Sequence, residues 1–350
     1  MTVPFVPDIF SISRPSWRPA NSQFYSVFAT LSTHLPAEFF PLRGSPEESQ
    51  TLGINSNNFR ISAQHSSWIL KRLPNSSRFN DVNRTLKMMA WLADEGLPVP
   101  RPKPFSDGSF LYLSGSSLWC LFPYLEGNYF SGAGVEIETA AEAIGRLTSV
   151  LKQCPVSLQP SVGPLHLTDS DDMIINICND CMDQWGEIFG EEHAQILKGA
   201  WETLSCIWSS LRTTPPNAGL EQAVHFDLHP HNLLMNRMQV TGILDFESCR
   251  LMPVGYALAF AGLKLCRQAV AETGNLDLAR LIGNRFTRNL CNSNQSLYAL
   301  ADKFKELALT EVLRRICLII RLNIEINNKA WNKILPIQLN HLQEAELLFG

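Results

Sequence analysis

The chain has 350 residues, of which 45% are hydrophobic and 18% are charged, and its formal net charge is −4. This is the composition of an ordinary globular protein, and the mild negative charge argues against a nucleic-acid scaffold, which normally carries a basic patch. The N-terminus has no basic start followed by an apolar run, so we expect no secretory signal. No stretch reaches the roughly 18 apolar residues that a membrane span needs, so we expect no membrane partner.

The length exceeds what one small core requires and suits two lobes. The nine cysteines are scattered along the chain, mostly within apolar segments, and their number is odd. This distribution fits reduced thiols better than a disulfide framework. We therefore expect a cytoplasmic protein.

The first third of the chain is expected to be rich in strands. Residues 1–22 contain many Pro, Ser and aromatic residues without a period, which indicates an irregular arm. Apolar, β-prone residues predict a strand at 66–73 and a hairpin built from 110–113 and 118–122. Apolar residues at helical spacing predict a helix at 81–95, which Gly96 ends.

The rest of the chain is expected to be mainly helical, with one polar motif interrupting the helices near their middle. The segment Pro123-Tyr124-Leu125-Glu126-Gly127 has the character of a hinge. We therefore expect an N-terminal lobe at 1–122, a hinge at 123–127 and a C-terminal lobe at 128–350. The expected helices are 137–152, 171–189, 191–211, 254–272, 276–290, 296–325 and 336–348.

The polar motif at 225–232 reads His-Phe-Asp-Leu-His-Pro-His-Asn, and Leu-Asp-Phe-Glu follows at 244–247. Two short apolar strands between them predict an antiparallel hairpin in which residue 234 lies opposite 243. Asn232 and Asp245 then meet at the open end, where their oxygens suit Mg²⁺. Asp227 lies in the loop before the hairpin, in position to accept or orient the proton of a substrate hydroxyl.

The same segment permits a second interpretation, a metal-hydrolase cluster, because His225, Asp227, His229 and His231 alternate. Pro230 disrupts a regular strand, which would be needed to hold these side chains on one face. The phosphoryl-transfer interpretation is therefore favoured, with His225 as a scaffold of the loop.

On these residues the chain resembles the aminoglycoside phosphotransferase and choline kinase-like superfamily of small-molecule kinases. In that family the catalytic loop commonly reads His-Gly-Asp-Leu-His-Pro-Gly-Asn, followed by Ile-Asp-Phe or Ile-Asp-Trp. The resemblance implies an α+β, bilobal protein kinase-like fold, with a small antiparallel-sheet N-lobe and a larger, mainly helical C-lobe. It also implies that Asp227 is the catalytic Asp, while Asn232 and Asp245 bind Mg²⁺.

The resemblance extends to the nucleotide site. Lys71 is similar to the family's strand Lys, which contacts the α- and β-phosphates of ATP. Residues 53–59 are similar to its phosphate-covering loop, with Gly53 as the one glycine. Backbone groups near Tyr124 and Leu125 are then expected to hydrogen-bond adenine.

One departure from the family lies on the small-lobe helix, which usually carries a Glu that pairs with the Lys. The corresponding stretch, 82–89, has no acid on the expected face, and Asp81 is the nearby candidate. The leading hypothesis is an ATP- and Mg²⁺-dependent kinase acting on a hydroxyl of a small molecule. An amino alcohol, a sugar or amino sugar, a hydroxy amino acid and an aminoglycoside all remain open as acceptors.

The alternative is a catalytically weak, kinase-like nucleotide-binding or scaffold protein. The missing helix Glu and the single-glycine loop favour it, and the intact Asp227, Asn232 and Asp245 favour the enzyme. The sequence leaves the oligomeric state open.

Overall fold

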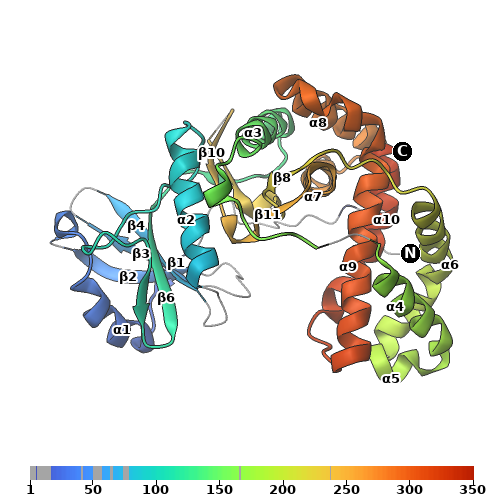
Figure 1. Cartoon of the computed structure of the whole chain (residues 1–350), viewed down its shortest axis with the longest axis horizontal. Helices are drawn as coiled ribbons and strands as arrows, with labels where there is room; N and C mark the ends of the chain where they lie inside the picture. Colours follow the sequence, from blue (N-terminus) through green and yellow to red (C-terminus); the bar gives the residue numbers. More distant parts are fainter. Residues whose placement is uncertain are drawn as a thin grey trace.

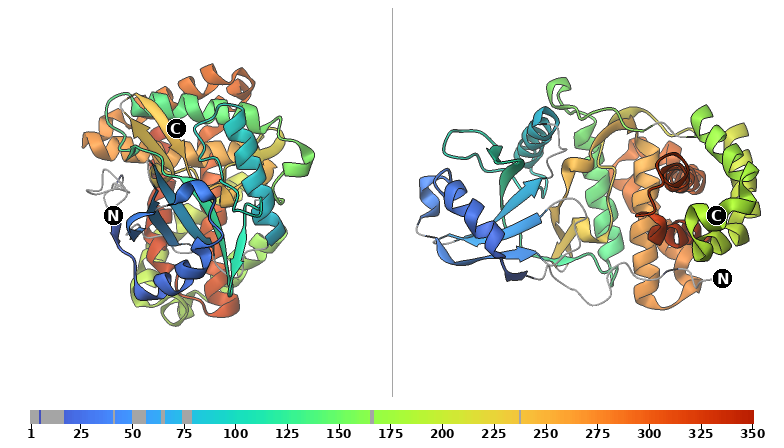
Figure 2. Two further views of the ribbon diagram at one scale, coloured as in Figure 1. Left: turned by 90° about the vertical axis from the view of Figure 1, so that its left-hand side faces the viewer. Right: turned by 90° about the horizontal axis from the view of Figure 1, so that it is seen from below.

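The computed structural model describes residues 5, 17–40, 42–49, 57–63, 66–73, 79–164, 167–236 and 238–350. These residues form two parts, an antiparallel sheet near the N-terminus and a mainly helical remainder, which lie side by side (Figure 1; Figure 2). The expected α+β class with two lobes is confirmed.

The N-terminal sheet has six strands in the order β1-β2-β3-β4-β6-β5, and each neighbouring pair is antiparallel. Helix α1 (Ser22–Ser32) packs on the sheet, where Phe24 stacks on Phe59 with ring centroids 3.9 Å apart. Leu70 of β4 belongs to this cluster, so the next side chain, Lys71, points to the opposite face. The strands are β1 Trp17–Pro19, β2 Arg43–Ser49, β3 Asn57–Ser62, β4 Ser67–Leu73, β5 Tyr112–Ser114 and β6 Ser117–Pro123.

The end of the expected irregular arm is regular structure. Trp17–Pro19 pair with the edge of β2, and Asn21 caps α1 by accepting a hydrogen bond from the Phe24 N–H at 2.9 Å. The expectation of irregular chain up to residue 22 is therefore wrong at its end. A three-residue strand is stabilised by backbone hydrogen bonds to its neighbour, so it leaves no alternating pattern in the sequence.

The helical part follows the expected order, with one helix broken into two. The expected helix at 171–189 consists of α4 and α5, because the Trp185 indole donates to Cys178 O at 2.9 Å, a carbonyl that a continuous helix would use. The helices are α2 Phe79–Asp94, α3 Glu136–Leu151, α4 Asp169–Asp180, α5 Trp185–Phe189, α6 Glu191–Thr213, α7 Val254–Thr273, α8 Ala279–Ser293, α9 Phe304–Ile326 and α10 Leu335–Phe349. Short 3₁₀ helices lie at 37–39, 156–158, 182–184, 230–232, 246–248, 276–278, 295–303 and 332–334.

Two small sheets lie between the N-terminal sheet and the large helices (Figure 1). In the first, the hairpin of β9 and β10 pairs Leu233 with Ile243 and Leu234 with Gly242, and an irregularity lies between Val240 and Gly242. The expected pairing of 234 with 243 is wrong by one residue, because the ladder already starts with Asn236 opposite Gln239, and the extra residue that the bulge adds to β10 makes up only part of the difference. The strands are β7 Asn128–Tyr129, β8 Glu221–Val224, β9 Leu233–Asn236, β10 Gln239–Ile243 and β11 Arg250–Pro253.

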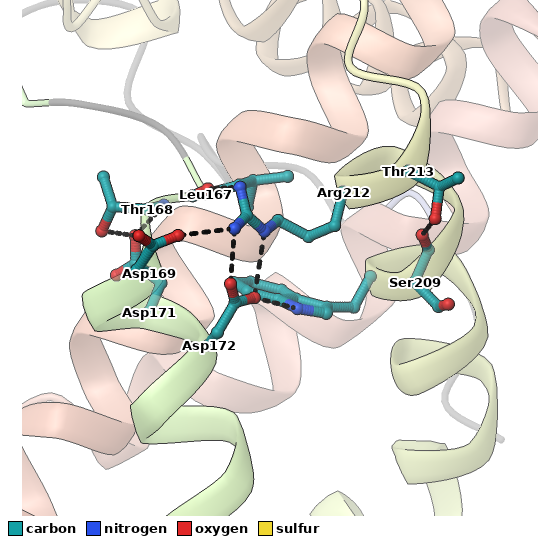
Figure 3. A network of polar contacts seen from close by, with 9 residues as sticks. Leu167, Thr168, Asp169, Asp171, Asp172, Ser209, Arg212 and Thr213 are labelled. Carbon is teal, nitrogen blue, oxygen red and sulfur yellow. Dashed lines mark hydrogen bonds and ion pairs between the residues drawn. The ribbon is translucent and has the colours of Figure 1, made fainter.

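A polar network that is partly exposed to solvent fixes α4 against its neighbours (Figure 3). Arg212 of α6 pairs with Asp169 and Asp172 of α4, and the Trp208 indole also donates to Asp172. On the other side of α4, Asp171 pairs with Arg321 of α9 at 2.9 Å. These contacts fix α4 between α6 and α9.

Across the described part of the chain, every helix is too short or too polar to pass through a lipid bilayer. The nine cysteines all belong to the described residues and are free thiols, most of them buried. Burial raises the pKa of several of these thiols, including Cys120 and Cys249, so they remain protonated at neutral pH.

Candidate active site

The loop that begins at His225 is held by the buried imidazole itself. Its Nε2 lies 2.7 Å from Leu244 O, an acceptor, so Nε2 carries the proton. Its Nδ1 accepts the Asp227 N–H at 3.3 Å. Burial lowers the pKa of His225, which favours the neutral ring that this pattern requires. His225 therefore connects the catalytic loop to the hairpin as a scaffold.

Asp227 and Asn232 are joined across the loop between them. The Asn232 side-chain amide donates to Asp227 O at 2.8 Å, which leaves the Asn232 carbonyl oxygen as an acceptor. This bond uses the backbone carbonyl of Asp227 and leaves its carboxylate available. The Asp227 side chain is 46% exposed, and His229 Nε2 lies 3.8 Å from Asp227 Oδ2. The loop thus presents one carboxylate to the solvent side and one amide oxygen beside it.

Asp245 is brought to this loop by the hairpin. The Leu244 N–H donates to Asn232 O at 2.9 Å, so residues 232 and 245 lie close together although the strand register differs from the expected one. Asp245 has a left-handed backbone, with φ 61° and ψ 52°. This conformation is uncommon for a residue with a Cβ and turns the chain sharply after the strand.

Lys71 reaches the same point from β4 of the other lobe. Its Nζ lies 2.6 Å from Asp245 Oδ1 and 2.8 Å from Glu247 Oε1, and its side chain is only 8% exposed. Burial alone would lower the pKa of Lys71, but the two carboxylates outweigh it and raise the pKa. Lys71 in turn lowers the pKa of Asp245 against the opposing effect of burial. The ammonium is therefore charged and held between two carboxylates.

Glu247 is the carboxylate that the sequence interpretation missed. We expected the partner of Lys71 on α2, with Asp81 as the nearby candidate, but Asp81 lies 3.9 Å from Arg84 and lines a separate cavity of about 210 Å³. The α2 residue that lines the same cavity as Lys71 is Met89. The available signal was the Asp-Phe-Glu sequence, which puts a second acid two residues after Asp245.

A cavity of about 120 Å³ separates the two lobes at Lys71, Asp245 and Glu247. Its remaining wall is mostly apolar, as expected for a site that encloses a planar ring. The apolar wall includes Ile69, Met89, Phe122, Leu125, Leu234 and Leu244.

Tyr124 and Leu125 line this cavity, as expected of the segment after β6. The Tyr124 N–H already donates to Ser67 O at 3.0 Å, so that one donor is engaged within the protein. Trp17 of β1 also lines the cavity, and its ring centroid is 6.2 Å from that of Tyr124. Gly53, expected in the phosphate-covering loop, lies outside the described residues.

The side-chain oxygens of Asn232 and Asp245 are suitable ligands for a magnesium ion that also binds phosphate. One Asp245 oxygen faces Lys71 and the other remains available, and Asn232 keeps its carbonyl oxygen. Mg²⁺ usually takes one or two protein oxygens and completes its shell with phosphate and water. Within the described residues no group of three or more His, Cys, Asp or Glu side chains could hold a metal. The alternating His225, His229 and His231 do not form such a group.

Comparison with known proteins identifies the relatives of this chain. A model of the phosphotransferase enzyme family matches residues 51–287. The homoserine kinase of Bradyrhizobium sp. (strain ORS 278) is 23% identical over 291 residues, which is 82% of this chain and 82% of that protein.

Two solved structures show the same fold at low sequence identity. Spectinomycin phosphotransferase, in complex with ADP and spectinomycin, aligns with a TM-score of 0.65 at 14% identity, over 95% of this chain and 99% of that one. A microcompartment-associated aminopropanol kinase aligns with a TM-score of 0.58 at 14% identity, over 92% and 96%. The protein kinase-like fold implied by the catalytic motif is thereby confirmed.

Proposed function

Since the chain belongs to the phosphotransferase enzyme family and is a small-molecule kinase, we propose that it transfers the γ-phosphoryl group of ATP, with Mg²⁺, to an acceptor hydroxyl. The observation that carries this proposal is the convergence of Lys71, Asp245 and Asn232 at one end of an apolar cavity. The ADP complex of a structural neighbour supports nucleotide binding in the same fold.

In the proposed nucleotide site, adenine lies in the apolar cavity and the phosphates point toward Lys71. The carbonyl of Tyr124 and the N–H of Leu125 are the proposed adenine contacts, because the Tyr124 N–H is engaged. We place the hinge at 123–127, between an N-terminal lobe at 1–122 and a C-terminal lobe at 128–350. The end of β6 at Pro123 and the start of β7 at Asn128, in another sheet, support these boundaries.

In the proposed reaction, the acceptor oxygen forms a bond to the γ-phosphorus. The bond from that phosphorus to the β,γ-bridging oxygen breaks, and ADP leaves with the electron pair. The Asp227 carboxylate accepts the hydroxyl proton, and its exposure leaves it open to an acceptor. Asn232 and Asp245 would hold Mg²⁺, which supplies positive charge to the phosphate oxygens when bound.

Lys71 is the proposed fixed positive charge for the phosphates. Glu247 and Asp245 hold its ammonium at 2.8 Å and 2.6 Å, so the site supplies a carboxylate partner that α2 lacks. This contact removes one of the two reasons for the alternative, a catalytically weak kinase-like scaffold. A preorganised charge stabilises the transferring group more than a mobile one, because little reorganisation is needed during the reaction.

The relatives suggest small, hydroxyl-bearing acceptors. A homoserine kinase, an aminopropanol kinase and a spectinomycin phosphotransferase are among them, so an amino acid, an amino alcohol and an aminocyclitol antibiotic are all represented. Free thiols throughout the described chain support our proposal of a cytoplasmic enzyme.

A panel of hydroxyl compounds tests the proposed function. The purified protein is incubated with ATP and Mg²⁺, and phosphorylated product is detected by mass spectrometry alongside ADP formation. We expect transfer to at least one acceptor, and its loss in Asp227→Asn. Persistent ATP binding without transfer to any acceptor, and without Asp227-dependent hydrolysis, would favour the scaffold.

A further inference from the structure

Two arginines of α9 lie next to the catalytic loop on the side away from Lys71. The guanidinium carbons of Arg314 and Arg315 lie 5.3 Å and 5.6 Å from the ring centroid of Phe226. Phe226 directly precedes Asp227, and the related catalytic loops commonly have Gly at this position. The two cations therefore belong to the surroundings of the proposed catalytic carboxylate.

These two arginines share one carboxylate. Arg314 makes a two-pronged contact with Glu311, from Nε at 2.9 Å and from a terminal amino group at 2.8 Å. Arg315 donates its Nε–H to the same carboxylate at 2.6 Å, and Glu311 is completely buried. The nearby Asp171 pairs with Arg321. Two guanidinium groups thus contact the one carboxylate of Glu311 beside the loop.

Arg315 retains the donors needed for a ligand. Neither of its terminal amino groups hydrogen-bonds to a residue that the structure describes, and its side chain is 25% exposed. Its guanidinium lies only 3.9 Å from the Phe260 ring centroid, which fixes the plane of the group. A guanidinium held in this way presents a fork that matches a carboxylate.

The imidazole of His341 on α10 lies near cations of α7 and α9. His341 is completely buried, and neither ring nitrogen hydrogen-bonds to a described residue. Burial, and then Lys264, Arg267 and Arg315, lower its pKa well below the usual range. Arg267 pairs with Glu344 at 3.0 Å, and His341 Nε2 lies 3.6 Å from the same carboxylate.

We propose that Arg315 binds a carboxylate of the acceptor, with the charge of Arg314 beside it, so that the preferred acceptor is a small hydroxyl compound bearing a carboxylate. This inference rests on the proposed kinase function and names its substrate class. A polycationic aminoglycoside would meet like charge at this point, which costs affinity. One arginine is enough to neutralise the Glu311 carboxylate, and Arg314 does so through two hydrogen bonds.

A matched pair of acceptors isolates the carboxylate. L-Homoserine and 3-aminopropan-1-ol have the same hydroxyl and amine and differ by the carboxylate alone, and spectinomycin serves as the cationic comparison. We measure kcat/KM for each at saturating ATP. We expect L-homoserine to exceed 3-aminopropan-1-ol by about 10-fold or more, the usual effect of a charge-assisted hydrogen bond.

Variants of α9 then assign this preference to the arginines. Arg315→Gln is expected to reduce the ratio of the two kcat/KM values by about 10-fold, and Arg315→Lys, which keeps the charge without the fork, by less. Arg321→Gln is the matched control, because it makes the same change on the same helix at a residue that pairs with Asp171. Melting temperatures establish that each variant is folded.

Each outcome decides between the two proposals. Equal or better phosphorylation of 3-aminopropan-1-ol or spectinomycin overturns the carboxylate inference and leaves the kinase function intact, as does an equal loss of preference in Arg321→Gln. Absence of all transfer together with absence of Asp227-dependent ATP hydrolysis overturns the kinase function itself. If hydrolysis occurs without transfer, calorimetry on the ADP-loaded protein decides, and binding of L-homoserine no tighter than that of 3-aminopropan-1-ol overturns the inference.

Discussion

The two sides of the catalytic loop balance their charges in opposite ways. On the nucleotide side, one ammonium, Lys71, lies between two carboxylates, Asp245 and Glu247. On the α9 side, two guanidinium groups, Arg314 and Arg315, share the single carboxylate of Glu311. Among these residues, carboxylates outnumber the cation in the first cluster, and cations outnumber the carboxylate in the second.

This difference indicates what each side is built to receive. An excess carboxylate beside an apolar cavity is completed by a cation, as expected where Mg²⁺ accompanies a nucleotide. An excess guanidinium is completed by an anion, which is the basis of the acceptor class inferred above. In each cluster the shared central group is shielded from solvent, with Lys71 at 8% and Glu311 at 0% exposure, and screening is weak there.

The largest expected effect is that of Asp227→Asn, which tests whether the two sides meet at a shared catalytic group. The amide cannot accept the hydroxyl proton, so we expect kcat to fall by about 10²–10⁴-fold while ATP still binds. Steady-state ADP formation measures kcat, and ATP-induced thermal stabilisation measures binding. A fall in kcat of less than 10-fold would exclude Asp227 as the proton acceptor.

Lys71→Met tests the nucleotide side by removing its cation. We expect kcat to fall by about 10²–10³-fold, because the phosphates lose a fixed positive charge and two carboxylates are left without a partner. Lys87→Met is the matched control, since Lys87 lies exposed on α2. Similar kinetics for the two variants would contradict the proposed role of Lys71.

Glu247→Gln tests whether the second carboxylate positions Lys71. Asp245 still holds the ammonium in this variant, so we expect a smaller loss of kcat, about 10-fold. Asp81→Asn, which changes the acid first suggested by the sequence, is expected to alter kcat by less than about 2-fold, because Asp81 pairs with Arg84. If Asp81→Asn has the larger effect, the assignment of Glu247 fails.

The smallest expected effect is that of His341, near Arg315, on the pH dependence of stability. The folded pKa of His341 lies below its unfolded value, so the unfolded chain binds more protons as pH falls through about 6.5, and stability is lost there. One such group contributes at most about 1.4 kcal/mol of unfolding free energy per pH unit. We expect His341→Leu to reduce the loss of stability between pH 7 and pH 5.5, measured by urea unfolding. An unchanged decline would show that His341 is not a source of it.

The catalytic segment could be predicted because its information is local. Asp227, Asn232 and Asp245 are separated by a short hairpin, so their approach follows from two apolar strands and a turn, even though the β10 bulge shifts the register by one residue. Lys71 was identified through its resemblance to the family's strand Lys, and it does lie on β4. Three features escaped prediction: the pairing of Trp17–Pro19 with β2, the break between α4 and α5, and the partner of Lys71.

The sequence by itself determined the kinds of elements, their order and the catalytic motif, because helix and strand periods and turn residues act over a few neighbouring positions. Only the tertiary structure decided which charges face one another. Glu247 meets Lys71 across 176 positions of chain, and Arg314 meets Phe226 across 88, and no local pattern encodes either contact. Electrostatic pairing depends on distance through space and on burial, and both are fixed only when the lobes and helices pack.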